Sequence, residues 1–295
     1  MDSQYLPGDV LVFKKVDNYP LGDLIAFMTD SDVFHAALVY GSMTTAELGF
    51  EGIFTTEIST DGSRPAYHMR HKTQEDMTKV IDAAKVYLDK HIPYDHQSLV
   101  FIAGLIIYHK YFKTPKYKAI VDTILGIACW SLDKYLNDII HGKNSDAMMC
   151  SQFVYQCFYD AGGNYRLNIT NGVVFGKRQT GETRLVDLLN EAKSSEPLPE
   201  YHIPDTEIGE IDEESLAQSL LDALKESASS DSETSTDGNG AEQSMKQILS
   251  KADKFLNLLE KILETIGSKM PLPSLFVTPA DLLCHTENLK EVKAE

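Results

Sequence analysis

Short apolar runs separated by turn residues dominate the first 60 positions of the chain. The run 10–13 follows a Pro-Gly-Asp turn, and a second run covers 35–40. Two more runs, 45–48 and 53–58, lie on either side of a turn that contains two glycines. Runs of this length and composition are typical of strands. Four of them so close together predict an antiparallel meander, because parallel strands need longer crossover connections.

The apolar pattern changes to a helical period further along the chain. Apolar or small side chains recur at helical spacing over 73–90 and predict an amphipathic helix. Two strongly apolar stretches, 98–108 and 119–132, follow with four lysines between them, which predicts a helical hairpin with a basic tip. Both stretches are shorter than the ~20 residues that span a bilayer, so we expect buried helices. The run 151–161 ends at two glycines and predicts another helix.

Charge is distributed unevenly along the 295 residues. The formal net charge is −17, and the segment 191–240 alone carries 14 acidic and 2 basic residues. This composition predicts a partly flexible acidic linker. The amphipathic helix predicted over 241–269 has a wide apolar stripe that includes Phe255, Leu259 and Ile262, so we expect it to dock on the rest of the protein. No cluster of lysine and arginine marks a nucleic-acid surface, and nucleic acid is not an expected partner.

The four cysteines form neither a paired motif nor a dense framework. Cys129, Cys150, Cys157 and Cys284 are irregularly spaced, which favours free thiols in a reducing compartment over disulfides or a zinc site. His68 and His71 lie close together, but no cysteine or carboxylate pattern accompanies them, and we expect a solvated strand end. We therefore expect no metal and no cofactor. The first residues lack the pattern of a cleaved signal peptide, which favours a cytoplasmic protein or export by another route.

One cysteine has a setting that suits a nucleophile. Cys150 precedes the predicted helix 151–161, and a helix N-terminus stabilises the thiolate that attacks carbonyl carbon. The free N–H groups of that first turn, including that of Ser151, could also bind a developing oxyanion. Cys157 lies two turns deeper on the same helix, where a core position is expected.

A histidine and a carboxylate in the predicted meander complete a candidate triad. His35 begins the second strand and is the candidate general base for Cys150. Glu47 lies on the next strand, where antiparallel pairing could place its carboxylate beside the distal ring nitrogen. A carboxylate in that position fixes the tautomer and stabilises the imidazolium.

Several short motifs, taken in their order, resemble the permuted papain-like amidases of the YiiX type, which are related to the NlpC-type cysteine peptidases. These are the opening strand Pro7-Gly8-Asp9-Val10-Leu11-Val12-Phe13, the histidine strand from His35 to Gly41 with Glu47 after it, the segment Ile92-Pro93-Tyr94-Asp95, the nucleophile segment Cys150-Ser151-Gln152-Phe153-Val154, and the closing segment Val277-Thr278-Pro279-Ala280-Asp281-Leu282. Ala37 departs from the family, which usually has glycine after the histidine.

The resemblance implies an α+β, papain-like fold of the circularly permuted NlpC type, in which a small antiparallel sheet packs on the nucleophile helix. It implies cleavage of an amide, either peptide or related acyl, through a Cys150 acyl-enzyme, and it implies that Tyr94 shapes the oxyanion side of the cleft. The expected organisation is a catalytic domain over 1–190 with a helical insertion at about 97–146, the linker 191–240, and a helix and closing segment over 241–295 that dock back.

Two other functions remain open on the sequence. Lecithin:retinol acyltransferase-like proteins share the order of histidine before cysteine, and the apolar hairpin suits an acyl substrate at a membrane surface. Their usual Asn-Cys-Glu-His motif is replaced here by Met149-Cys150-Ser151-Gln152, which favours the amidase. The other alternative is an inactive interaction protein, or an effector or toxin delivered into another cell, on the same fold. The sequence sets no oligomeric state.

Overall fold

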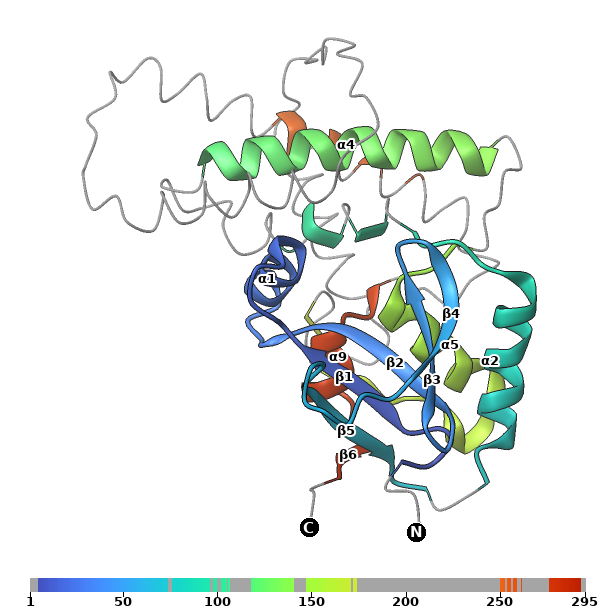
Figure 1. The fold of residues 1–295 in the computed structure, drawn as a ribbon. Coiled ribbons are helices and arrows are strands. Elements are labelled where there is room, and N and C mark those ends of the chain that lie inside the picture. Colours follow the sequence, from blue (N-terminus) through green and yellow to red (C-terminus); the bar gives the residue numbers. More distant parts are fainter. Residues whose placement is uncertain are drawn as a thin grey trace.

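One antiparallel sheet of six strands, in the order β4-β3-β2-β1-β5-β6, organises the computed structural model (Figure 1). The structure describes residues 5–73, 76–95, 98–99, 102–104, 106, 118–140, 147–170, 172–173, 250–252, 254–255, 257–258, 261 and 276–292. The strands are β1 (Val10–Lys14), β2 (Val33–Gly41), β3 (Thr44–Gly49), β4 (Gly52–Glu57), β5 (Ala66–His71) and β6 (Leu289–Glu291).

Alternation along the strands sends side chains to two different layers. Val12 and Leu38 face a large core that the helices complete, whereas Leu11 and Val39 face a smaller cluster on the other side of the sheet. Successive strand side chains point to opposite faces, so a run that is apolar throughout is buried on both. The smaller cluster contains Ile58 from the segment after β4.

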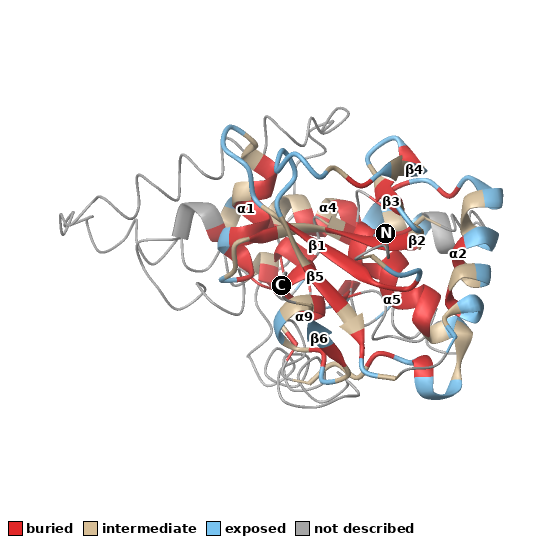
Figure 2. Ribbon diagram, turned by 60° about the horizontal axis from the view of Figure 1, so that its bottom comes forward, coloured by how far each residue is buried: buried red, intermediate tan, exposed pale blue. Residues whose placement is uncertain are grey.

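Helices cover the larger core face. They are α1 (Pro20–Met28), α2 (Thr78–Lys90), α5 (Cys150–Ala161) and α9 (Pro279–Cys284), with a 3-10 turn, η2 (Gly163–Tyr165). α1, α5 and α9 pack on β2, and α2 packs on α5. Figure 2 shows buried residues along the central strands and α5, with exposed residues along the outer side of α2. α5 therefore lies between the sheet and α2.

The predicted mixed α+β architecture and the antiparallel meander are confirmed. The helix predicted from residue 73 begins at Thr78 instead. Its start is displaced because the Asp76 carboxylate accepts hydrogen bonds from both the backbone N–H and the hydroxyl of Thr78. Side-chain acceptors at this position satisfy donors that the first turn leaves free.

A long helix forms a separate layer at one end of the sheet. α4 (Lys118–Ile140) contains the apolar stretch predicted over 119–132 and continues eight residues beyond it. The segment 250–258 packs beside it, with Phe255 fully buried and the Lys251 Nζ 2.7 Å from the Asp122 Oδ2. Phe255, a residue of the predicted apolar stripe, is therefore buried beside α4.

Other predicted features lie outside the described residues. These are the acidic linker 191–240, the basic tip of the hairpin, and the stripe residues Leu259 and Ile262. The closing segment is described: α9 packs on β1 and β2, and β6 pairs with β5. Within the described ranges, no helix combines the length and apolar character that crossing a bilayer requires.

Candidate active site

Cys150 is the first residue of α5, and the chain before it is held by backbone pairing. Met148 forms a parallel bridge with Tyr94, in which the Asp95 N–H donates to the Met148 carbonyl at 2.9 Å and the Met148 N–H donates to the Pro93 carbonyl at 3.2 Å. This pairing sets the direction in which the chain enters the helix. The N–H groups of the first turn have no intrahelical acceptor, so the sulfur lies in a field that favours an anion.

The sulfur lies beside β2 where its pairing with β3 ends. The pairing begins at Ala37, opposite Glu47, so residues 33–36 have no β3 partner. Val39 donates its N–H toward β1, to the Asp9 carbonyl at 2.7 Å. Because strand N–H groups alternate in direction, the Ala36 N–H points away from β1, and it interacts with the Cys150 sulfur. The end of the β2–β3 ladder thus leaves a donor free for Cys150.

His35 bridges the sulfur and the carboxylate. Its Nε2 lies 2.9 Å from the Glu47 Oε2, and its ring also interacts with the Cys150 sulfur. The bond to Glu47 leaves Nδ1 as the nitrogen available to the sulfur. The side chain is 14% exposed, and Cys150 is 5% exposed. The structure therefore brings together the three residues that the sequence singled out, in a site that is largely closed to water.

The Glu47 carboxylate is buried and receives four hydrogen bonds. Oε1 accepts from the Thr45 hydroxyl at 2.7 Å and from an Arg64 nitrogen at 3.0 Å. Oε2 accepts from His35 at 2.9 Å and from the second Arg64 nitrogen at 2.8 Å. Glu47 is only 1% exposed, and an ionised carboxylate at such burial needs this degree of pairing.

These contacts shift the pKa values of all three groups toward the charged forms. Burial alone would lower the pKa of His35, but the Cys150 thiolate and Glu47 together raise it to about 9. Burial alone would raise the pKa of Glu47, but bonds from His35, Arg64 and Thr45 lower it to about 2. The pKa of the Cys150 thiol is also lowered, against the effect of burial, by His35 and by the N–H groups of Ala36 and Ser151. The favoured resting state is a thiolate–imidazolium pair.

The thiol pKa values of the other three cysteines are raised, which favours the neutral thiol. Burial raises the pKa of Cys129 to about 12 and raises that of Cys157 well above its ordinary value. Cys284 is exposed, and its thiol pKa is raised by partial burial and by nearby aspartates. Cys157 is fully buried in the core, as the sequence predicts. Cys150 is therefore the cysteine among these four whose surroundings favour the nucleophilic form.

The two weaker candidates lie close to Cys150. Tyr94 pairs with Met148, two residues before Cys150, and its ring packs edge-on against Phe50 with 4.9 Å between centroids. The Ser151 hydroxyl donates to the Val277 carbonyl at 2.6 Å, which joins α5 to the closing segment. An oxyanion contact from Ser151 would therefore come from its backbone N–H.

The two histidines of β5 are not at a solvated strand end, and that prediction is wrong. His68 is buried, with its Nε2 2.6 Å from the Asp9 Oδ2, and Arg70 donates to both oxygens of the same carboxylate at 2.7 Å. His71 is buried against Phe158. Both are buried because β5 lies inside the sheet, between β1 and β6. Among the residues described, no three metal-binding side chains cluster.

Known family models, curated proteins and solved structures were each compared with this chain, and none of them matches it. The geometry adds Arg64 and Thr45 to the residues predicted from the sequence. Thr45 and Glu47 lie on the same face of β3, so their contact could be predicted from the two-residue spacing. Arg64 lies in the loop before β5, and only the folded sheet brings it to Glu47.

Proposed function

We propose that the chain is a cysteine hydrolase that cleaves an amide or related acyl bond through an acyl-enzyme on Cys150. The observation that carries this proposal is that one imidazole, His35, hydrogen-bonds the buried Glu47 carboxylate and also interacts with the Cys150 sulfur. A nucleophile, a base and an orienting carboxylate in contact are the requirements of triad chemistry. The same contact argues against an inactive protein that merely keeps the fold.

The first half of the reaction uses the preformed ion pair. The Cys150 thiolate attacks the carbonyl carbon, and the negative charge moves to the carbonyl oxygen, where N–H groups of the first turn of α5 can stabilise it. The intermediate collapses as its carbon–nitrogen bond breaks. The His35 imidazolium gives its proton to the departing amine, which leaves a thioester on Cys150 and a neutral imidazole.

The second half regenerates the enzyme. Neutral His35 takes a proton from water while the water oxygen attacks the thioester carbon. The carbon–sulfur bond then breaks, the carboxylic product leaves, and the thiolate–imidazolium pair is restored. Glu47 stays ionised throughout, because its pKa of about 2 lies far below that of the imidazolium it stabilises.

The order of His35, Glu47 and Cys150 along the chain supports a papain-like fold with permuted connectivity. In this proposal α5 is the nucleophile helix and β2 and β3 carry the base and the carboxylate. The closing segment also fits, because Ser151 is bonded to Val277 and α9 packs on β2.

Trapping the acyl-enzyme tests the proposal. The full chain is incubated with a panel of activated peptide amides, acyl thioesters and acyl lipids in vesicles, quenched in acid, and analysed by peptide mass spectrometry. We expect acylation of Cys150, loss of turnover in Cys150→Ala, and normal turnover in the matched variant Cys284→Ala. Turnover that persists in Cys150→Ala would refute the proposal, and acylation from lipid alone would favour the acyltransferase-like alternative.

A further inference from the structure

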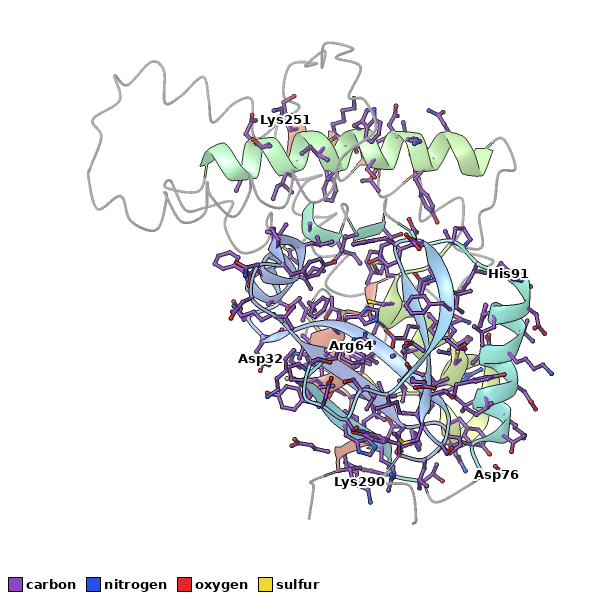
Figure 3. The ribbon with its side chains drawn as sticks, in the orientation of Figure 1. Asp32, Arg64, Asp76, His91, Lys251 and Lys290 are labelled. Atoms are coloured by element: carbon purple, nitrogen blue, oxygen red, sulfur yellow. The ribbon has the colours of Figure 1, made fainter. Side chains whose placement is uncertain are left out.

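We infer that Arg64 is a positioning residue of this site, which keeps Glu47 ionised and aimed at His35. The inference rests on the proposed function, since it assigns Arg64 a part in forming the reactive Cys150 thiolate. Arg64 lies on the loop between β4 and β5, and Figure 3 labels it over the middle of the sheet.

The guanidinium fixes the Glu47 carboxylate by two parallel bonds. One nitrogen donates to Oε1 at 3.0 Å and the other to Oε2 at 2.8 Å. With Thr45 on Oε1 and His35 on Oε2, each oxygen then has two donors. A forked pair of this kind defines the plane of the carboxylate, which a single bond does not. Arg64 thus holds Oε2 where the imidazole ring needs it.

Stacking fixes the guanidinium itself. It lies over the Phe13 ring at 4.2 Å from the centroid, and the Phe13 ring is in turn 5.5 Å from the His35 ring. The next residue is tied to β1, because the Lys14 N–H donates to the Pro65 carbonyl at 2.8 Å. Arg64 is 40% exposed although its partner is buried, so it forms the outer side of the carboxylate site.

A small cavity adjoins this pair on the same side of the sheet. Its volume is about 50 Å³, and its lining includes Glu47, Arg64 and His68. Space of this size admits water. Without the guanidinium, water would replace two charge-assisted bonds on Glu47, and Thr45 and His35 would be its remaining protein donors. The carboxylate would then take up a proton more readily, and its pKa would rise from about 2 toward the ordinary value.

The effect on Cys150 has a definite sign. Protonation of Glu47 in acid removes the charged partner of the imidazolium. This weakens the thiolate–imidazolium pair, so the Cys150 thiol should hold its proton to higher pH. The loss of thiolate is confined to acidic pH, because Glu47 is ionised at neutral pH with or without Arg64.

The experiment measures the alkylation rate of Cys150 by iodoacetamide against pH in the full chain, by peptide mass spectrometry. For Arg64→Met we expect a rate roughly three- to fivefold below wild type near pH 4, and within about twofold at pH 7.5. Arg64→Lys keeps the positive charge but loses the two parallel hydrogen bonds, so its alkylation rate should lie between those of wild type and Arg64→Met. The matched control is Arg166→Met, because Arg166 also stacks on a ring, that of Tyr159, but at the far end of α5.

A double variant separates this role from a purely structural one. In a Glu47→Gln background, Arg64→Met should have no further effect on the acid side of the profile. The inference is overturned if Arg64→Met and Arg64→Lys both reproduce the wild-type profile, or if Arg64→Met acts equally with and without Glu47. Failure of the proposed function looks different, because wild-type Cys150 would then lack preferential alkylation at any pH.

Discussion

Replacing Glu47 by glutamine should lower the pKa of His35 while leaving the shape of the site nearly unchanged. Glutamine has almost the same volume and can still accept from Thr45 and Arg64, but it carries no charge. The imidazolium then retains the Cys150 thiolate as its charged partner and loses the carboxylate 2.9 Å from Nε2. The exposed side of Arg64 allows its guanidinium to turn to water, which limits the cost of leaving it unpaired.

The size of the effect follows from the pKa of His35. A rise from 6.5 to about 9 is about 2.5 pH units, or about 3.4 kcal/mol in favour of the imidazolium. Cys150 supplies more of this stabilisation than Glu47 does. Burial opposes the rise, so the contributions of Cys150 and Glu47 together exceed this net value. Loss of Glu47 should therefore lower the pKa of His35 by about 1 unit or more.

The assay is an NMR titration of the histidine ring protons, with His35 assigned by its absence in His35→Asn. Glu291→Gln is the control, because it removes an exposed carboxylate from β6, at the opposite edge of the sheet from β4. A pKa for His35 that is unchanged within about 0.3 units in Glu47→Gln, or that rises, would refute the electrostatic account.

Two stability predictions concern buried contacts around the site. Asp9→Asn weakens the bonds to His68 and Arg70 and should lower the free energy of unfolding in urea by about 2 to 4 kcal/mol near pH 7. The bonds to these partners lower the pKa of Asp9, so its contribution is present above the unfolded value of 3.8 and is lost as pH falls below it. A difference from wild type that stays constant down to about pH 2 would contradict this assignment. Ser151→Ala leaves the buried Val277 carbonyl without its donor and should lower the free energy of unfolding by about 1 to 3 kcal/mol. Iodoacetamide should still alkylate Cys150 in this variant. Loss of alkylation in a folded Ser151→Ala protein would contradict the assignment.

Local patterns were sufficient for the part of the fold in which neighbours in sequence pair with one another. β2, β3 and β4 are joined by short turns, and β1 to β4 carry apolar runs, so the meander and the approach of Glu47 to His35 could be predicted. The start of α5 was predictable for a similar reason, because an apolar run follows Cys150 directly.

Long-range pairing accounts for what the sequence did not predict. β5 contains the buried His68 and the partly buried Tyr67 and Arg70. Their partners are distant in sequence, because Asp32 accepts from Tyr67, Asp9 bonds to His68 and Arg70, and the distant strand β6 pairs with β5. Arg64 follows a turn of Ser59, Asp61 and Ser63 whose composition is typical of exposed loops. Its contact with Glu47 requires β1 to bring the ends of β4 and β5 together, which no local pattern encodes.

The protonation state of Cys150 is the most direct test of the account. The alkylation rate of each cysteine is measured from about pH 5 to pH 10 in wild type and in His35→Ala, by peptide mass spectrometry. We expect Cys150 to react already near pH 6, before exposed Cys284 and buried Cys157, whose thiol pKa values are raised. In His35→Ala, reaction of Cys150 near pH 6 should fall strongly, because burial then favours the thiol. Preferential labelling of Cys284 or Cys157, or a wild-type Cys150 rate that rises only above about pH 8, would contradict a thiolate held by His35.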